Sequence, residues 1–401
     1  MRIALVTAAI LLSAGAGAAQ QSTSTAPSAP DIVVTGQRLI DTQRALERCI
    51  AAHCSPDQDI AATLAHAENQ FVAGAYKDAR DTLDRSLGRN KALGKQYPVP
   101  VASLWRAQSR ISVHLGESDT YRISQIEALD VLKNGLGQND PRTLAQRLEV
   151  ADAFAHLGRI EGALPMYRDV AKRAHIIGNT AMEGQALFHI AMLNSVLAEV
   201  QPAIYRYEAK RSIAALADTT APEMEPFRNA VKLLQARMAA KEGDTAAVDR
   251  MVADFRSSNT RNPTLIYAPP ISNDSADRAY SDGSMTGKMA VNTYENQWVD
   301  ISFWIAPNGM VTDAAILRAS PTLQKQWVDP VLKSIGGRRY SPLALKSSDP
   351  GLLRVERYTM TAHWATGTGT HLRVREGIPR IEMLDLTADP GPTKATQAAP
   401  G

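Results

Sequence analysis

The 401-residue sequence predicts a multidomain protein in which an all-α array of helical repeats is followed by a small α+β domain. Residues 39–255 are rich in Ala, Leu, Glu, Arg and Gln, with apolar residues three or four apart, which is typical of helices. Gly74, Gly116 and Gly158 recur at intervals of 42 residues, which indicates repeated helix–helix turns. Residues 298–364 then follow the order strand, strand, helix, strand.

Residues 1–19 have the composition of a signal peptide. Arg2 provides the charged start, Ile3–Leu12 the apolar stretch, and Ser13–Ala19 a run of small residues that suits signal peptidase. The alternative is a membrane anchor, but an apolar stretch of about ten residues is well short of the roughly 20 that span a bilayer. We therefore expect export to the periplasm of a Gram-negative cell, with no stable membrane span after cleavage.

Residues 20–45 form a predicted flexible leader. Its first part contains mainly Ser, Thr, Ala, Pro and Gln, a composition too polar to bury a core. A short β-prone run follows, made of Ile32, Val33, Val34 and Thr35 and ended by Gly36. An extended segment of this kind needs a sheet edge to pair with.

Cys49 and Cys54 are the only cysteines. In an oxidising compartment an even pair this close favours a local disulfide. The spacing does not place both on one helical face, but Ser55-Pro56 should end the helix and let Cys54 turn back. We interpret the pair as a structural clip, since a redox pair needs a tighter CxxC arrangement.

The helical repeats of residues 46–258 resemble tetratricopeptide (TPR) units. The pattern is clearest in the third unit, where small, large and turn residues alternate in the order Ala151, Phe154, Gly158, Ile160, Ala163, Tyr167 and Val170. The stretch from Leu132 to Leu144 resembles the junction of longer, kinesin-light-chain-type units. A generic helical bundle is the alternative, but it predicts no fixed turn spacing. The resemblance implies a TPR-like superhelix over about half of the chain.

Residues 259–292 lose this periodicity and gain Pro, Ser, Asn, Asp and Gly, so we predict a linker between separate domains. The second domain is predicted over residues 293–386. Its expected elements are a strand at 298–305, a turn at Pro307-Asn308-Gly309, a strand at 310–317, a helix at 322–335, a strand at 352–364 and further strand structure at 372–386. Residues 387–401 are predicted to be a disordered tail.

This second domain resembles the C-terminal domain of TonB. The resemblance depends on Val299–Ile305, Asn308-Gly309, Val311, Asp313-Ala314 and Arg339-Tyr340-Ser341-Pro342. It implies a domain that pairs edge-to-strand with an envelope partner, with a TonB-dependent receptor as the candidate. The run from Ile32 to Thr35 in turn resembles a TonB box. We expect this run to dock beside the third strand, near Val355, of its own or a neighbouring chain; a leader that docks nowhere is the alternative.

The candidate partner-binding residues lie on the first helices of neighbouring repeats. His114 and His156 are 42 residues apart and should occupy equivalent positions, with Arg110 and Asp152 beside them. Arg106 lies one turn before Arg110 on the same predicted helix. In TPR domains this surface lines a groove, so the five residues are predicted to bind a peptide, with both arginines able to pair with carboxylates. Ordinary polar surface is the alternative, and metal binding by the two histidines is disfavoured.

The sequence favours a non-catalytic interaction protein without cofactor or metal. It contains no HExxH, GxSxG, SxxK or GxxxxGK[ST] motif. A net charge of only +3, from 44 basic and 41 acidic residues, disfavours nucleic acid as a partner. The expected partner is an envelope protein or peptide. Two alternatives stay open: a TonB-type energy transducer with an uncleaved anchor, and a periplasmic hydrolase with an unfamiliar site.

Overall fold

The computed structural model describes residues 38–244, 246–247, 250–251, 263–271, 297–345, 351–366 and 373–387. The predicted signal peptide, the run Ile32–Thr35 and the tail from residue 388 lie outside these residues. Within the described residues, no helix is both long enough and apolar enough to cross a membrane.

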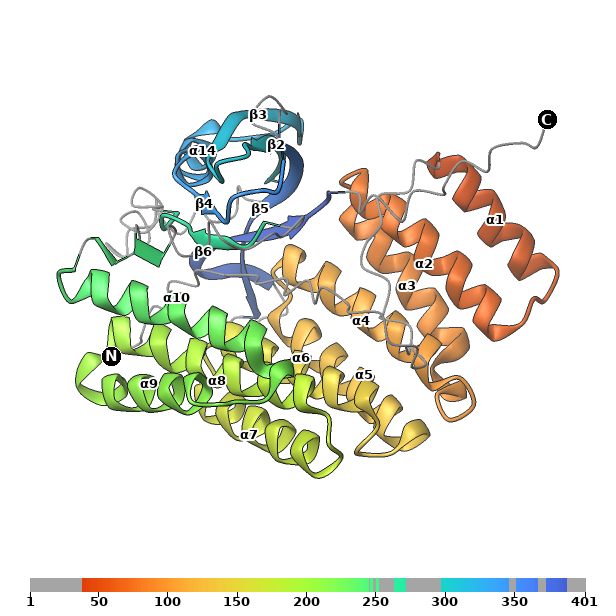
Figure 1. Cartoon of the computed structure of the whole chain (residues 1–401). Helices are drawn as coiled ribbons and strands as arrows, with labels where there is room; N and C mark the ends of the chain where they lie inside the picture. The colour runs from red at the N-terminus through yellow and green to blue at the C-terminus, as the bar shows by residue number, and fades with distance from the viewer. Residues whose placement is uncertain are drawn as a thin grey trace, which may run out of the picture.

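The first part of the described chain is a stack of antiparallel helical hairpins (Figure 1). Its helices are α1 (Leu39–Ala51), α2 (Pro56–Val72), α3 (Tyr76–Asn90), α4 (Pro98–Leu115), α5 (Ser118–Leu136), α6 (Pro141–His156), α7 (Ile160–Ile176), α8 (Thr180–Val200), α9 (Pro202–Ala217) and α10 (Glu225–Lys241). Each helix packs against its neighbours in sequence, and α10 packs against both α8 and α9. Short 3₁₀ turns at Lys91–Leu93 and Pro222–Met224 precede α4 and α10. The predicted helical repeat region is thus confirmed.

Local sequence explains where these helices begin and end. Proline occupies the first helical position of α2, α4, α6 and α9, where its missing N–H is not needed. Gly74, Gly116 and Gly158 lie in the turns after α2, α4 and α6, and each has the left-handed backbone that glycine adopts without strain. The 42-residue interval read from the sequence is therefore the interval between equivalent turns.

The core of the array follows the small-and-large alternation of the predicted third unit. Ala151 and Ala163 are fully buried where α6 and α7 approach each other, and Tyr167 and Val170 fill the space beside them. Phe154 and Ile160 pack against the same cluster from its rim. Small residues permit close helix contact and large ones interdigitate, which stabilises a stack whose hairpins have little core of their own.

The second part is an antiparallel four-stranded sheet with one helix on its face. Its strands are β2 (Gln297–Ile305), β3 (Val311–Ala319), β5 (Leu352–Thr366) and β6 (Arg373–Asp385), in the order β3-β2-β5-β6. After a 3₁₀ turn at Lys325–Trp327, α14 (Val328–Gly336) covers the face that carries Val299, Ile301 and Phe303. The predicted order of two strands, helix and third strand is present, and the additional strand structure expected near the C-terminus is β6.

Two expectations about this part are wrong. Leu265–Tyr267, inside the predicted linker, forms strand β1 and pairs with β4 (Arg339–Tyr340), because Ile266 can bury its side chain against the array. The edge of β5 proposed for docking is also occupied. Val355 pairs with Ser302 on β2, and on its other side its carbonyl accepts a hydrogen bond from the Leu386 N–H. β6 therefore takes the place expected for the Ile32–Thr35 run.

Candidate functional site on the helical array

The sheet does not stand apart from the array, as the predicted linker implied, but lies on the C-terminal ends of α2, α4 and α6 (Figure 1). The face opposite α14 makes this contact through side chains of β2, β5 and β6. We call this contact the seam. It determines which of the predicted groove residues face the protein's own sheet.

Arg357 of β5 is the central residue of the seam. Its guanidinium is fully buried and pairs with the fully buried Asp300, with Nε 2.6 Å from Oδ1. It also donates to the backbone oxygens of Phe71 at 2.6 Å and Val72 at 2.8 Å, and it lies 4.1 Å from the ring centroid of Trp298. The last carbonyls of a helix have no partner within it and carry partial negative charge. Arg357 therefore caps α2 from the sheet.

Two turn glycines of the array, Gly74 and Gly116, lie in close contact with the sheet. A Cβ on Gly74 would lie 2.5 Å from the Trp298 ring, and one on Gly116 would lie 2.1 Å from the Ala362 carbonyl oxygen. Trp364 donates its backbone N–H to the Gly116 carbonyl at 3.2 Å and its indole N–H to the Leu115 carbonyl at 3.1 Å. The two glycines thus allow the left-handed backbone of the hairpin turns and leave room for the sheet to pack against them.

The two predicted histidines both lie in the seam. His114 is buried, and its Nδ1 is 3.0 Å from the Thr359 hydroxyl; burial lowers the pKa of this imidazole to about 4. His156 Nε2 lies 3.2 Å from the Glu382 carboxylate of β6. Burial alone would raise the pKa of Glu382, but His156 and Arg380 beside it lower this pKa to about 2. These histidines contact the protein's own sheet, which occupies the surface predicted for a partner.

The other three predicted residues lie one or two turns before the seam, within a wider set of charged groups. We call this set the inner-face strip; it consists of Glu68 on α2, Arg106 and Arg110 on α4, Glu149 and Asp152 on α6, and His189 on α8. Asp152 accepts a hydrogen bond from the Tyr167 hydroxyl at 2.5 Å and contacts His189 Nδ1 at 2.8 Å. Burial alone would lower the pKa of His189, but Asp152 and Glu149 raise it.

Among the described residues, the arginines of the strip form one hydrogen bond with the rest of the fold. Arg106 donates to the Ser103 hydroxyl at 2.8 Å, and among the described residues no carboxylate forms an ion pair with Arg106 or Arg110. Burial and the charge of Arg110 lower the pKa of Arg106. Two neighbouring cations without a carboxylate in contact leave most of their N–H donors available.

Two carboxylates of the strip, Glu68 and Glu149, have raised pKa values. Burial raises the pKa of Glu68 to about 7, although Arg110 opposes the shift, and Glu68 Oε1 is buried without a hydrogen-bond partner among the described residues. Desolvation, followed by the charge of Asp152, raises the pKa of Glu149. Opposite charges thus influence one another across α2, α4 and α6 without direct contact. This arrangement suits a ligand that brings its own donors and acceptors.

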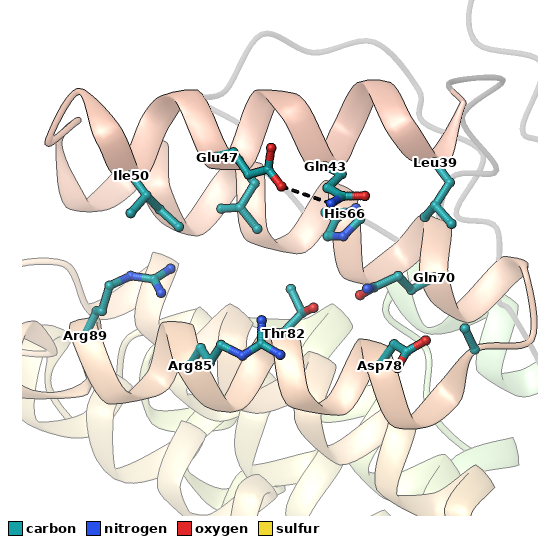
Figure 2. Close-up of a pocket in the computed structure, with 12 residues that line it drawn as sticks. Leu39, Gln43, Glu47, Ile50, His66, Gln70, Asp78, Thr82, Arg85 and Arg89 are labelled. Atoms are coloured by element: carbon teal, nitrogen blue, oxygen red, sulfur yellow. Dashed lines mark hydrogen bonds between the residues drawn. The ribbon is translucent and has the colours of Figure 1, made fainter.

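Sequence reasoning missed Glu68, Glu149 and His189 as well as the whole seam. A signal for Glu68 was present, because it precedes Arg110 by the same 42 residues that separate Arg110 from Asp152. No repeat-length relation connects Glu149 or His189 to the predicted set. A second unforeseen feature is an open groove of about 380 Å³ between α1, α2 and α3 (Figure 2).

The structure also joins Cys49 and Cys54 in a disulfide between α1 and α2, with their Cα atoms 5.2 Å apart. Within the described residues, no group of three or more His, Cys, Asp or Glu side chains could hold a metal ion.

The fold defines the chain as a helical-hairpin repeat protein with a C-terminal sheet domain. No protein-family model matches the sequence, and no curated protein matches it. Among solved structures, the chain is similar to nearly identical TPR-like repeats of a protein from Podospora anserina described as a kinesin light chain. The identity is 17%, the TM-score is 0.38, and the match covers 51% of this chain and 99% of that chain.

Proposed function

We propose that the chain is a non-catalytic interaction protein of the Gram-negative periplasm whose inner-face strip binds an extended peptide segment of an envelope protein. Stacked helical hairpins of the TPR-like kind are typical of protein–protein interaction. The signal-peptide pattern of residues 1–19 supports the location.

The observation that carries this proposal is the unused hydrogen-bonding capacity of Arg106 and Arg110 beside Glu68 and Glu149. An extended peptide offers carbonyl oxygens or carboxylates to guanidinium groups, and N–H groups to carboxylates, along one line. Such a segment would satisfy both kinds of group at once. A purely apolar ligand would leave all of them unpaired and desolvated.

The sheet domain contributes a second contact in this proposal. Its resemblance to the TonB C-terminal domain supports edge-to-strand pairing with an envelope protein, such as a TonB-dependent receptor. Because β6 already covers β5, the pairing would use the outer edge of β3, which among the described strands pairs only with β2. Leu317 of β3 is 56% exposed, so this edge strand carries an apolar side chain on its solvent-exposed face.

The strip is tested by site-specific photo-crosslinking in cells. A photoreactive residue at Ser103, beside Arg106, should give one discrete protein adduct. The double variant Arg106→Gln/Arg110→Gln should reduce this adduct at least tenfold, since two charge-assisted contacts are worth about 1.5–3 kcal/mol each. Arg206→Gln/Lys210→Gln is the matched control, because these cations lie on the exposed surface of α9 beside Glu242. An adduct that survives the first double variant would contradict the proposal.

One observation favours a hydrolase as a second candidate. Asp152 orients His189, as the acid of a catalytic pair orients its general base. Among the described side chains, no serine, threonine or cysteine is hydrogen-bonded to this imidazole, so the dyad lacks the nucleophile of a covalent mechanism. Turnover of an ester or peptide substrate that is lost in His189→Asn would establish this candidate.

A further inference from the structure

The groove between α1 and α3 has two unlike walls (Figure 2). Leu39, Leu46 and Ile50 provide the apolar side chains of the α1 wall, and Leu39 and Ile50 are each 41% exposed. Gln43 and Glu47 line the same wall and are hydrogen-bonded to each other. The opposite wall on α3 carries Arg85 and Arg89. An exposed apolar stripe facing a cationic one favours a segment with apolar side chains and an acidic end.

The charges are also graded along the groove. Figure 2 shows Arg89 near the Ile50 end, Arg85 nearer the middle beside Thr82, and Asp78 toward the Leu39 end, with Glu47 on the facing helix α1. Arg89 is bound to Asp59, whereas Arg85 forms no ion pair among the described residues. On the floor, Gln70 Oε1 is buried without a hydrogen-bond partner among these residues. An occupant should therefore place its acid near Arg85, offer an N–H donor to Gln70, and enter at the Leu39 end.

We propose that residues 31–36 of the same chain fold back at Gly36 and lie in this groove, antiparallel to α1. The described chain begins at Arg38, directly before Leu39 at the groove entrance, so the preceding residues start there. Six extended residues span roughly 20 Å. The 13 residues of α1 rise by about the same length. The extended segment and the groove therefore have about the same length.

The side chains of the segment match the groove in order. Ile32 and Val34 share one side of an extended chain and come to lie along the apolar side chains of α1. Asp31 and Val33, on the other side, point toward α3, with Asp31 near Arg85. Glycine at position 36 permits the reversal that this path requires. The β-prone run thus binds the first helices of its own array and does not pair with β5, whose edges are both occupied.

Photo-crosslinking of the full mature chain tests this. Benzoylphenylalanine at Val33 should crosslink within the same chain to residues 39–50 and 78–89, as mapped by mass spectrometry. The same probe at Val200, which is 45% exposed at the end of α8, is the control and should give no such products. Crosslinks between two chains, crosslinks to β3, or no defined product would each overturn the proposal.

Charge reversal distinguishes a specific register from a merely apolar contact. Arg85→Glu should lower the crosslinking yield about fivefold, and combining it with Asp31→Arg should restore the yield. Arg85 is exposed and unpaired among the described residues, so this change leaves the fold intact. If Arg85→Glu leaves the crosslinking yield unchanged, or if adding Asp31→Arg does not restore a lowered yield, the placement of Asp31 is refuted.

Discussion

The seam and most of the inner-face strip lie one or two helical turns apart on α2, α4 and α6, yet their charged groups have different surroundings. On α4, His114 of the seam follows Arg110 of the strip by four residues, and on α6 His156 follows Asp152 by four. In the seam, Arg357 is fully buried with Asp300 and two carbonyl groups as partners. In the strip, Arg106 and Arg110 have no carboxylate in contact among the described residues.

This difference separates groups that hold the fold from groups that are available to a partner. A buried charge is tolerated only when its partners are in place, so the seam must be complete whenever the chain is folded. The strip is under a weaker requirement, because each of its six residues keeps part of its surface exposed to solvent. Substitutions in the two regions should therefore differ in their effects on stability.

Arg357→Met should have the largest effect. It removes the Arg357 donor from the Val72 carbonyl and one of the two donors of the Phe71 carbonyl, which keeps the Gly74 N–H. It also removes one partner of the buried Asp300, which among the described residues keeps Arg318. Breaking a buried pair costs about 3–5 kcal/mol, so we expect a loss of this size in the free energy of unfolding measured with urea. Hydrogen exchange should also increase in β5 and at the end of α2.

Arg354→Met on the same strand is the matched control. Arg354 pairs with Asp385 at 3.3 Å at the surface, and an exposed pair contributes about 1 kcal/mol or less. Equal losses for the two variants would show that the seam is no more important to stability than an ordinary surface contact.

His114→Asn should remove a pH dependence of comparable size. The pKa of His114 is about 4 in the folded protein and 6.5 when unperturbed, so the unfolded chain binds the proton first as the pH falls. The contribution of His114 to the free energy of unfolding is therefore fully present above pH 6.5. It decreases as the pH falls toward 4, by up to about 3 kcal/mol. An asparagine keeps a polar group near Thr359 but does not titrate.

Urea unfolding of wild type and variant at pH 7, 5.5 and 4.5 measures this effect. The difference between their slopes against pH isolates His114 from His66, whose pKa burial also lowers. Glu382 loses its contribution only below pH 4.5, because its folded pKa is about 2. Parallel slopes for the two proteins would show that His114 is not held neutral by the seam.

Gly116→Ala should destabilise the protein by an intermediate amount. Its Cβ would lie 2.1 Å from the Ala362 carbonyl, so either the turn or β5 must move, at a cost of about 1–3 kcal/mol beyond that of the left-handed backbone. Gly178→Ala is the control, since Gly178 has φ +69° against +76° for Gly116 but nothing within 4 Å. If both variants unfold at the same urea concentration, the contact between β5 and the Gly116 turn does not disfavour a side chain at position 116.

The sequence predicted the elements of both regions better than their contact. Local patterns predict the turn spacing, the hairpin around Asn308-Gly309 and the order of elements in the sheet domain. Each pattern is readable from neighbouring residues, as hydrophobic periodicity or turn residues. The docking of Arg357 on α2 does not, because it joins residues 285 positions apart. Nothing in the neighbourhood of either residue signals the other. The predicted linker reinforced the error, since it suggested two separate units.

The candidate site was foreseen in part for the same reason. Arg106, Arg110 and Asp152 could be placed on one surface because repeat register relates α4 to α6. The repeat register placed His114 and His156 on the same predicted surface. Only the positions of β5 and β6 show that these two histidines face the sheet. Glu68 and Glu149 acquire their significance from desolvation, which depends on the folded surroundings of a side chain.

The smallest effect is expected in the strip, from Glu68→Gln. The folded pKa of Glu68 is about 7 and the unperturbed value is 4.5, so the folded state holds the proton more tightly and stability falls as the pH rises from 4.5 to 7. The glutamine variant cannot ionise. It should be more stable than wild type by on the order of 1 kcal/mol at pH 8, with the gain vanishing near pH 4.5.

Urea unfolding at both pH values decides this, and Glu47→Gln is the control, because Glu47 is exposed and hydrogen-bonded to Gln43. A stabilising substitution in the strip would mean that folding alone does not favour a charged group at position 68. A carboxylate that weakens the fold at neutral pH belongs to a surface that serves a partner, as in other proteins where a binding site reduces stability. If Glu68→Gln instead destabilises the chain at pH 8, Glu68 supports the fold, and the boundary between seam and strip must be moved to include α2.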